Sequence, residues 1–168
     1  MWGSDGTSGA ERIGGNADFY DGYDFRRCYY KCLYSNQYFM IDNYKYSDIT
    51  ELVIKAFYNV YNKLGYGFLE KVYEKALAIE CKKLGLNCLF QCPIEVFYDN
   101  EVVGLYIADM IVNRFVIVEI KAASAITAEH EVQLINYLKA TEIEVGLLLN
   151  FGKKPEFKRK VFSSEYKE

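Results

Sequence analysis

The chain has 168 residues, 51% of them hydrophobic, which suffices for one domain with a substantial core but not for two. A net charge of −3 and a pI of about 5.4 exclude a protein that is basic throughout, as many general nucleic-acid-binding proteins are. No apolar run approaches the ~20 residues of a membrane span, and the first residues lack the apolar core of a signal peptide. We therefore expect a soluble, intracellular, cytoplasmic protein with no membrane partner.

The first 39 residues differ in composition from the rest. Six of the 12 glycines lie within the first 22 residues, and a tyrosine-rich stretch without clear periodicity follows them. Such a segment has no apolar stripe to bury. We predict that residues 1–39 form a poorly ordered or loosely docked N-terminal extension and that residues 40–168 form the folded domain.

Two helices are predicted next. Asp48 and Glu51 have the spacing of a capping box, apolar residues follow at helical spacing as far as Leu64, and Gly65 closes the helix. A second helix is predicted from about Leu69 to Leu84, before Gly85. Its expected apolar stripe comprises Leu69, Tyr73, Ala76, Leu77 and Leu84.

Three strand-like runs, 88–99, 101–112 and 115–122, come after the helices, with turns at 99–100 and 113–114. A third helix is predicted over 127–140 and a buried strand over 145–151. The last cluster, "KKPEFKRK" at 153–160, holds five cations in eight residues and is predicted to be a solvated basic tail. The order α-α-β-β-β-α-β predicts an α/β fold, a mixed β-sheet flanked by helices.

Charged residues interrupt two of the apolar strands. Asp109 lies within "LYIADMIV", and Glu119 and Lys121 lie near the end of "FVIVEIKA". Residues two apart in a strand point to the same face, so Glu119 and Lys121 share one side. Buried charge is costly without a partner, and carboxylates beside a lysine suit a Mg²⁺ site that also binds phosphate. A simpler interpretation of Glu119 and Lys121 alone is an ion pair at a sheet edge.

The metal hypothesis depends on the turn between the second and third strands. A two-residue hairpin at Asn113 and Arg114 pairs Asp109 with Val118 and points it away from Glu119. A three-residue loop, or a bulge, places Asp109 opposite Glu119. The hypothesis therefore predicts the three-residue loop or a bulge.

An acid on one strand followed by Glu-x-Lys on the next resembles the PD-(D/E)XK nuclease superfamily. "GFLEKVY" at 67–73 is similar to the signature of its GxxExxY family, and "HEVQLINYLKAT" resembles the Gln-x-x-x-Tyr helix of its RecB-like branch. "GLLLNFG" at 146–152 also resembles the GxxExxY family. The resemblance covers roughly residues 50–162, in matching order, and implies a restriction-endonuclease-like core.

The resemblance implies a role for each site residue. Asp109, Glu119 and the main-chain carbonyl of Ile120 would hold Mg²⁺ or Mn²⁺, and Lys121 would position the attacking water or stabilise the transition state. Glu70 would be a direct or outer metal ligand. Two residues of the third helix, Gln133 and Tyr137, would line the site.

The sequence departs from the family pattern at four positions. Ala108 stands where the superfamily name has proline. Tyr61 and Tyr66 stand where relatives commonly have histidine and proline, and relatives often have an arginine near the position of Ile107. The departures leave Asp109, Glu119 and Lys121 intact.

Several residues have a second interpretation. Glu80 lies nearer the centre of the second helix's apolar stripe than Glu70, and could be the helix acid of the site or a satisfied structural acid. His130, the only histidine, could cap the third helix rather than act in catalysis. Tyr137 could be a core residue. The cysteine pairs 28/32 and 88/92 share a spacing that suits incidental thiols better than a zinc site.

The sequence therefore predicts a Mg²⁺-dependent nuclease that hydrolyses phosphodiester bonds of nucleic acid. Family analogy favours DNA over RNA as the substrate. The alternative is a catalytically silent nucleic-acid-binding or protein-interaction module on the same fold. The acidic pI indicates that a protein partner or a second copy of the chain could contribute to nucleic-acid binding.

Overall fold

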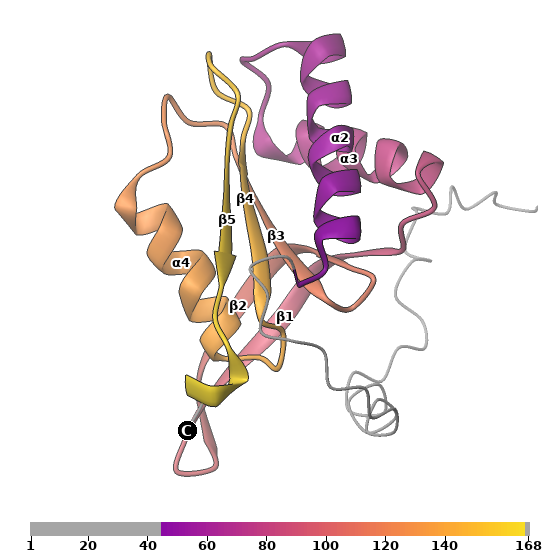
Figure 1. Cartoon of the computed structure of the whole chain (residues 1–168). Coiled ribbons are helices and arrows are strands. Elements are labelled where there is room, and N and C mark those ends of the chain that lie inside the picture. Colours follow the sequence, from indigo (N-terminus) through magenta and orange to yellow (C-terminus); the bar gives the residue numbers. More distant parts are fainter. Residues whose placement is uncertain (1–44, 167–168) are drawn as a thin grey trace, which may run out of the picture. The chain divides into compact units, whose positions relative to one another are not determined.

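The computed structural model describes residues 45–166 (Figure 1). Within them, three α-helices, five β-strands and a short 3₁₀-helix, η1 (Ser164–Tyr166), follow one another in the order α2, α3, β1, β2, β3, α4, β4, β5, η1. The extension predicted for residues 1–39 lies outside the described residues. No helix of the described part combines the length and apolar character needed to cross a membrane.

Helix α2 (Ser47–Leu64) forms because one face of the segment is apolar at helical spacing. Val53, Ala56 and Phe57 on that face are fully buried. The predicted capping box is wrong: the helix starts one residue before Asp48, and no side chain caps it. The residue before it, Tyr46, has left-handed backbone (φ 57°) and stacks on Phe115 with 4.7 Å between ring centroids. This tertiary contact fixes the start of the helix in place of a local cap.

Helix α3 (Glu70–Lys83) ends where predicted: Leu84 is its C-cap residue, and Gly85 follows with a φ of 76°. Tyr73 and Leu77 of the predicted stripe are fully buried. Leu69 is not part of the stripe, because it precedes the helix in extended backbone and is 78% exposed.

The five strands form one sheet in the order β1 (Cys88–Tyr98), β2 (Glu101–Val112), β3 (Val116–Lys121), β4 (Val145–Asn150) and β5 (Glu156–Val161). Strands β3 and β4 are parallel, and α4 (Ala128–Lys139) connects them; the other neighbours are antiparallel. The predicted α/β fold with a mixed sheet is confirmed.

The predicted basic tail is wrong, because residues 156–161 are strand β5 at the edge of the sheet, paired with β4. Its charges hid the strand in the sequence, since edge strands are half exposed and often carry lysines. Lys160 forms an ion pair with Glu131 of α4, and the guanidinium of Arg159 donates to the carbonyl of Lys45. These cations therefore attach the strand to its neighbours.

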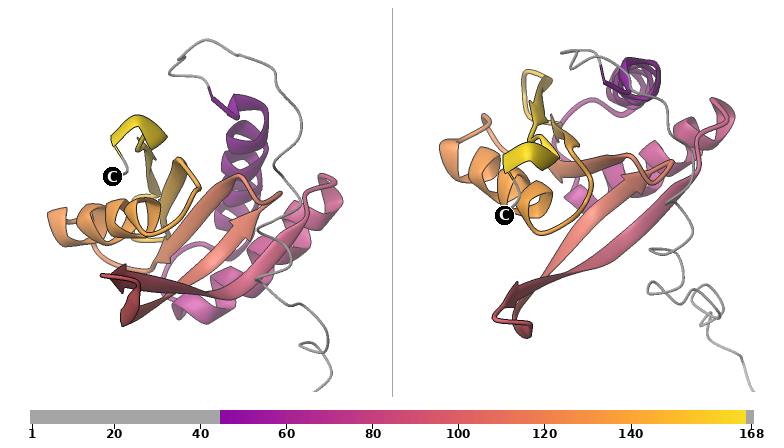
Figure 2. Two further views of the ribbon diagram at one scale, coloured as in Figure 1. Left: turned by 90° about the horizontal axis from the view of Figure 1, so that it is seen from below. Right: turned by 60° about the horizontal axis from the view of Figure 1, so that its bottom comes forward.

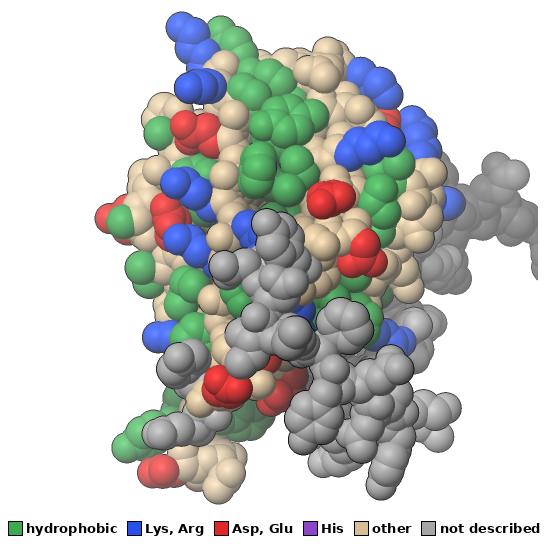
Figure 3. All heavy atoms as spheres, in the orientation of Figure 1, with side chains coloured by type: hydrophobic (Ala, Val, Ile, Leu, Met, Phe, Trp, Pro, Cys, Tyr) green, Lys and Arg blue, Asp and Glu red, His purple; other side chains and the backbone are tan. Residues whose placement is uncertain are grey.

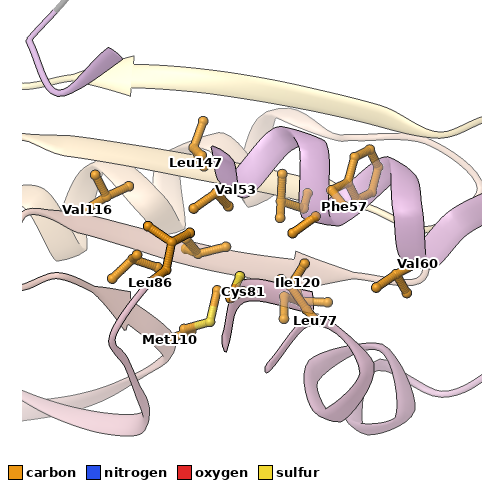
Figure 4. Close-up of a cluster of buried hydrophobic side chains, with 14 of the residues drawn as sticks. Val53, Phe57, Val60, Leu77, Cys81, Leu86, Met110, Val116, Ile120 and Leu147 are labelled. Atoms are coloured by element: carbon orange, nitrogen blue, oxygen red, sulfur yellow. The ribbon is translucent and has the colours of Figure 1, made fainter. Parts of the chain in front are cut away.

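The helices cover both faces of the sheet (Figure 2). Helices α2 and α3 pack on one face, where Phe57 and Leu77 belong to one buried cluster with Ile120 and Leu147 of the sheet (Figure 4). Helix α4 packs on the other face through a second cluster that includes Leu134, Tyr137, Leu138, Ile117 and Leu148. The face that carries Ile117 also carries Glu119, because side chains alternate along β3.

The contact between α4 and β4 leaves no space at Gly146. A Cβ there would lie 2.7 Å from Cδ1 and 3.0 Å from Cγ of Leu134, a fully buried side chain. We expect Gly146→Ala to lower the free energy of unfolding by about 1–3 kcal/mol through overpacking, measured by urea denaturation. Gly104→Ala is the control, because its Cβ would meet only Val96 at 3.6 Å. Equal stability of the two variants would contradict close packing at this contact.

Candidate active site

The loop between β2 and β3 contains three residues, 113–115. Met110 pairs with Val118 and Val112 with Val116, and the first two loop residues, Asn113 and Arg114, have φ of 49° and 70°. The three-residue alternative predicted from the sequence is confirmed. This register places Asp109 opposite Glu119 at the next step of the two strands.

Strand β2 separates from β3 at Asp109. The pairing of the two strands stops at Met110, whereas β3 stays paired with β4 as far as Lys121. In place of the next main-chain bond, Oδ2 of Asp109 accepts a hydrogen bond of 2.8 Å from the backbone N–H of Ile120. The carboxylate of Asp109 therefore lies in the fork between the two strands.

Glu119 is buried beside this fork, with 2% of its surface exposed. Its Oε1 accepts a hydrogen bond of 2.7 Å from the ammonium of Lys121, whereas its Oε2 is buried and has no hydrogen-bond partner in the described part of the chain. Burial, followed by the nearby charge of Asp109, raises the pKa of Glu119 to about 7. Burial also raises the pKa of Asp109.

The structure gives different contacts to Glu70 and Glu80, the two candidate helix acids of the site. Oε1 of Glu70 accepts a 3.3 Å hydrogen bond from the N–H of Ala122, next to Lys121, and its charge acts on Asp109 and Glu119. Glu80 instead binds Lys63 at 2.8 Å and Lys83 at 2.9 Å, and these bonds lower its pKa to about 2. Glu80 is thus a satisfied structural acid, and Glu70 is the helix acid that reaches the end of β3.

Helix α4 carries Gln133 and Tyr137 and packs on the face of the sheet that carries Glu119. Nε2 of Gln133 donates to the hydroxyl of Tyr137 at 2.5 Å, and that hydroxyl donates to the carbonyl of Ile107 at 3.3 Å. Tyr137 is 2% exposed, and burial raises its pKa to about 12. Tyr137 is therefore both a core residue and a link between α4 and β2, and it stays protonated at neutral pH.

His130 caps α4. Its Nδ1 accepts from the N–H of Thr127 at 3.3 Å, and its own N–H donates to Oγ1 of Thr127 at 3.5 Å. This reciprocal pair satisfies two main-chain donors of the first turn. The capping interpretation of His130 accounts for its contacts.

Comparison with known proteins identifies the fold family of this site. The family model described as "PD-(D/E)XK nuclease superfamily" matches residues 47–160, which include all of these acids. The chain belongs to the PD-(D/E)XK nuclease superfamily. A search of curated proteins found no match. Among solved structures, the crystal structure of SSO0001 is 21% identical with a TM-score of 0.43, and the match covers 70% of this chain and 59% of that one.

The superfamily's usual cofactor is a divalent metal ion, and the donors at the fork suit one. A hard cation such as Mg²⁺ takes one or two carboxylates and completes its shell with water and substrate oxygens. Asp109 and Glu119 supply two carboxylates, and the buried, unpartnered Oε2 of Glu119 is an oxygen in need of a ligand. No three His, Cys, Asp or Glu side chains of residues 45–166 form a cluster that could hold a metal ion by themselves.

Sequence reasoning missed a further acid, Glu74. It is buried and accepts 2.7 Å bonds from Lys71 and from Nε2 of Gln91, and its charge contributes to the raised pKa of Asp109. Glu74 lies one helical turn after Glu70, a spacing that places both acids on one side of α3. That spacing was the available signal, whereas the partner Gln91 on β1 is remote in sequence.

Asn150 is a second residue that the sequence did not reveal. It is fully buried at the end of β4, where its Oδ1 accepts from the N–H of Ala123 at 2.9 Å and its Nδ2 donates to the carbonyl of Ala123 at 3.0 Å. The backbone after Lys121 is thereby held at two successive residues, Ala122 by Glu70 and Ala123 by Asn150. At Gly152, a Cβ would lie 2.1 Å from the carbonyl oxygen of Ala123, so only glycine allows this approach.

The remaining sequence features lie outside the fork or have structural roles. The hydroxyl of Tyr61 donates to the carbonyl of Lys153 at 2.9 Å, and Ile107 is 51% exposed. Cys81, Cys88 and Cys92 are free thiols. The other half of the four-cysteine pattern, 28 and 32, lies outside the described residues.

The raised pKa of Glu119 predicts a pH-dependent stability. Its folded-state pKa of about 7 exceeds the ordinary value of 4.5, so without metal the folded state is favoured by its bound proton at low pH. That contribution is full below about pH 4.5 and is lost as the pH rises through 7. We expect Glu119→Gln, which never carries the charge, to be more stable than the wild type at pH 8 by up to about 3 kcal/mol.

The difference should shrink toward pH 5, as measured by urea denaturation in EDTA at several pH values. Glu95→Gln, a change at an exposed position on β1, is the matched control and should show no such trend. A Glu119→Gln variant less stable than the wild type at pH 8 would contradict the unfavourable burial of this charge.

Proposed function

We propose that the protein is a Mg²⁺- or Mn²⁺-dependent nuclease that hydrolyses phosphodiester bonds of nucleic acid, with DNA as the preferred substrate. The observation that carries the proposal is the buried Glu119, with one unpartnered oxygen, opposite Asp109 in the fork of β2 and β3. Superfamily membership supports the same chemistry. The residues Gly67, Glu70 and Tyr73 support placement in the GxxExxY family.

The metal would be held by the carboxylates of Asp109 and Glu119 and by the main-chain carbonyl of Ile120. When bound, it would polarise the scissile phosphate, stabilise the charge that develops there and lower the pKa of a bound water. Glu70, which is exposed and bonded to the backbone of Ala122, would act from outside this set through water. Each of these acids has a carboxylate oxygen that its present hydrogen bonds leave available.

Lys121 supplies the positive side chain of the fork. Its side chain is 15% exposed and bonds to Oε1 of Glu119 at 2.7 Å, so it is fixed between the buried acid and the surface. From there its ammonium would donate a hydrogen bond to the attacking water or to a phosphate oxygen in the transition state. Gln133 would line the site from α4, held in place by the hydroxyl of Tyr137.

Metal binding is the first test. Because the cation binds the folded state, Mn²⁺ or Mg²⁺ at 100 times its dissociation constant should raise the free energy of unfolding by about 2.7 kcal/mol. Asp109→Asn should abolish this rise, as measured by denaturation with and without metal. Glu80→Gln is the matched control, since Glu80 is bound to Lys63 and Lys83 away from the fork, and its response to metal should persist. An unchanged response in Asp109→Asn would place the metal elsewhere.

Cleavage is the second test, with labelled single- and double-stranded DNA and RNA in Mg²⁺ or Mn²⁺. We expect the wild type to cut, and Lys121→Ala and Glu119→Gln to cut about 100- to 1000-fold more slowly, because each removes transition-state stabilisation. Lys75→Ala, a change at an exposed lysine of α3, should cut like the wild type.

The remaining outcomes separate the alternatives. Metal bound at Asp109 without cleavage of any substrate would favour the catalytically silent binding module or a missing protein partner. Cleavage that persists unchanged in Lys121→Ala would contradict this site as its origin.

A further inference from the structure

Large apolar side chains are exposed immediately before Glu70. In the α2–α3 loop, residues 65–69, Tyr66 is 58% exposed, Phe68 47% and Leu69 78%. Single exposed apolar side chains are ordinary in soluble proteins. Two aromatic rings within three residues, just before a candidate active-site acid, are a more specific feature, because about half of each side chain remains exposed.

The loop is held from inside by Tyr73. This fully buried residue donates its hydroxyl hydrogen to the carbonyl of Gly65 at 2.9 Å and accepts from the N–H of Phe68 at 3.2 Å. Its ring stacks on Phe151 at 4.2 Å, and the ring of Phe68 meets it edge-on at 6.1 Å. With Tyr73 already occupying the core side, the loop presents its remaining aromatic surface to solvent in a fixed backbone.

Two exposed lysines lie on the neighbouring loop. Lys153 and Lys154 belong to the β4–β5 loop, residues 151–155, and neither forms an ion pair within the described part of the chain. The hydroxyl of Tyr61, in the last turns of α2, holds the carbonyl of Lys153 at 2.9 Å. Figure 1 shows the β4–β5 loop and the α2–α3 loop beside each other at the top of the view. Figure 3 shows blue side chains at the tip of the β4–β5 loop, next to a hydrophobic group.

The β4–β5 loop and the first residue of α3 are bonded to the end of β3. The N–H of Phe151 donates to the carbonyl of Lys121 at 2.7 Å, and Glu70, which follows the α2–α3 loop, accepts from Ala122. The exposed rings and the free lysines therefore flank the end of the strand that carries Glu119 and Lys121. A ligand bound across both loops would pass beside the fork.

We propose that the α2–α3 and β4–β5 loops bind a single-stranded segment of nucleic acid, with Tyr66 and Phe68 stacking on bases and Lys153 and Lys154 contacting phosphates. The proposal rests on the nuclease function and specifies its substrate as unpaired DNA or RNA. An exposed aromatic ring can stack on an unpaired base, whose face is free, but not on a base inside a duplex. Lysines beside such rings supply the electrostatic part of single-strand binding.

The test is binding of labelled oligonucleotides by fluorescence anisotropy in EDTA, where no metal-dependent cutting can occur. The wild type is expected to bind single-stranded DNA or RNA more tightly than a duplex of the same sequence. The double variant Tyr66→Ala, Phe68→Ala should weaken single-strand binding by about 5- to 100-fold, with little effect on the duplex. Lys153→Ala with Lys154→Ala should weaken both and reduce the salt dependence. The single-stranded DNA and RNA arms identify which polymer is bound.

Tyr98→Ala is the matched control for an exposed ring. Tyr98 is 70% exposed at the tip of the β1–β2 hairpin, seven residues or roughly 23 Å along β1 from Gln91, which adjoins the fork. It should bind like the wild type, and thermal unfolding of the Tyr98 and lysine variants should be unchanged, since those side chains are exposed. The Tyr66/Phe68 variant also loses the edge-on contact of Phe68 with Tyr73, so its unfolding temperature should fall slightly but stay above the assay temperature. Equal single-strand affinity in the wild type and the Tyr66/Phe68 variant, or no oligonucleotide binding at all, would overturn the proposal. Ring-dependent binding without cleavage in Mg²⁺ or Mn²⁺ would instead contradict only the nuclease function.

Discussion

The candidate site depends on the register between β2 and β3, which the three-residue loop at 113–115 sets. With two residues in the loop, every side chain of β2 would shift by one position relative to β3, and Asp109 would face away from Glu119. The observed register, Met110 with Val118, brings the two acids to the same step. At that step the strands part, so the main-chain N–H of Ile120 becomes available and Asp109 accepts its hydrogen bond. The loop length thus sets the pair of acids, and the separation of the strands at the same step leaves an opening beside them.

Without a bound metal ion, the balance of charges at the fork is unfavourable. The charges of Glu70 and Glu74 act on Asp109, those of Glu70 and Asp109 act on Glu119, and Lys121 is the cation bonded to Glu119. Bonds from Lys71 and Gln91 satisfy Glu74, whereas one oxygen of Glu119 remains unpartnered. A buried carboxylate oxygen without a partner lowers the stability of the fold. The apolar clusters on the two faces of the sheet offset that loss.

The helices and most strands follow from periodicity and punctuation in the sequence, because apolar spacing and glycines are local signals. Strand β5 was not predicted, because its charged residues have the pattern of a solvated tail, and an edge strand can carry the same charges. The start of α2 was also beyond local reasoning, because Tyr46 stacks on a residue that is remote in the chain. Both errors have one cause: contacts between distant segments overrode the local pattern.

The site shows the same division. Asp109, Glu119 and Lys121 were visible because charge inside an apolar strand is conspicuous, and Glu70 because it belongs to a recognisable motif. Glu74 and Asn150 were not, because a buried acid on a helix and an asparagine after "GLLL" acquire meaning only from Gln91 and Ala123 across the fold.

Contacts from three other segments determine how firmly the site is built. The segment after Lys121 has no strand on the β2 side, so its backbone could move if β4 alone held it. Glu70 bonds to Ala122, Asn150 bonds twice to Ala123, and Gly152 allows the β4–β5 loop to approach that carbonyl. A reacting group is effective when its backbone is fixed before substrate arrives. These bonds to Ala122 and Ala123 give Lys121 such a fixed position, and they connect α3, β4 and the β4–β5 loop to the same short segment.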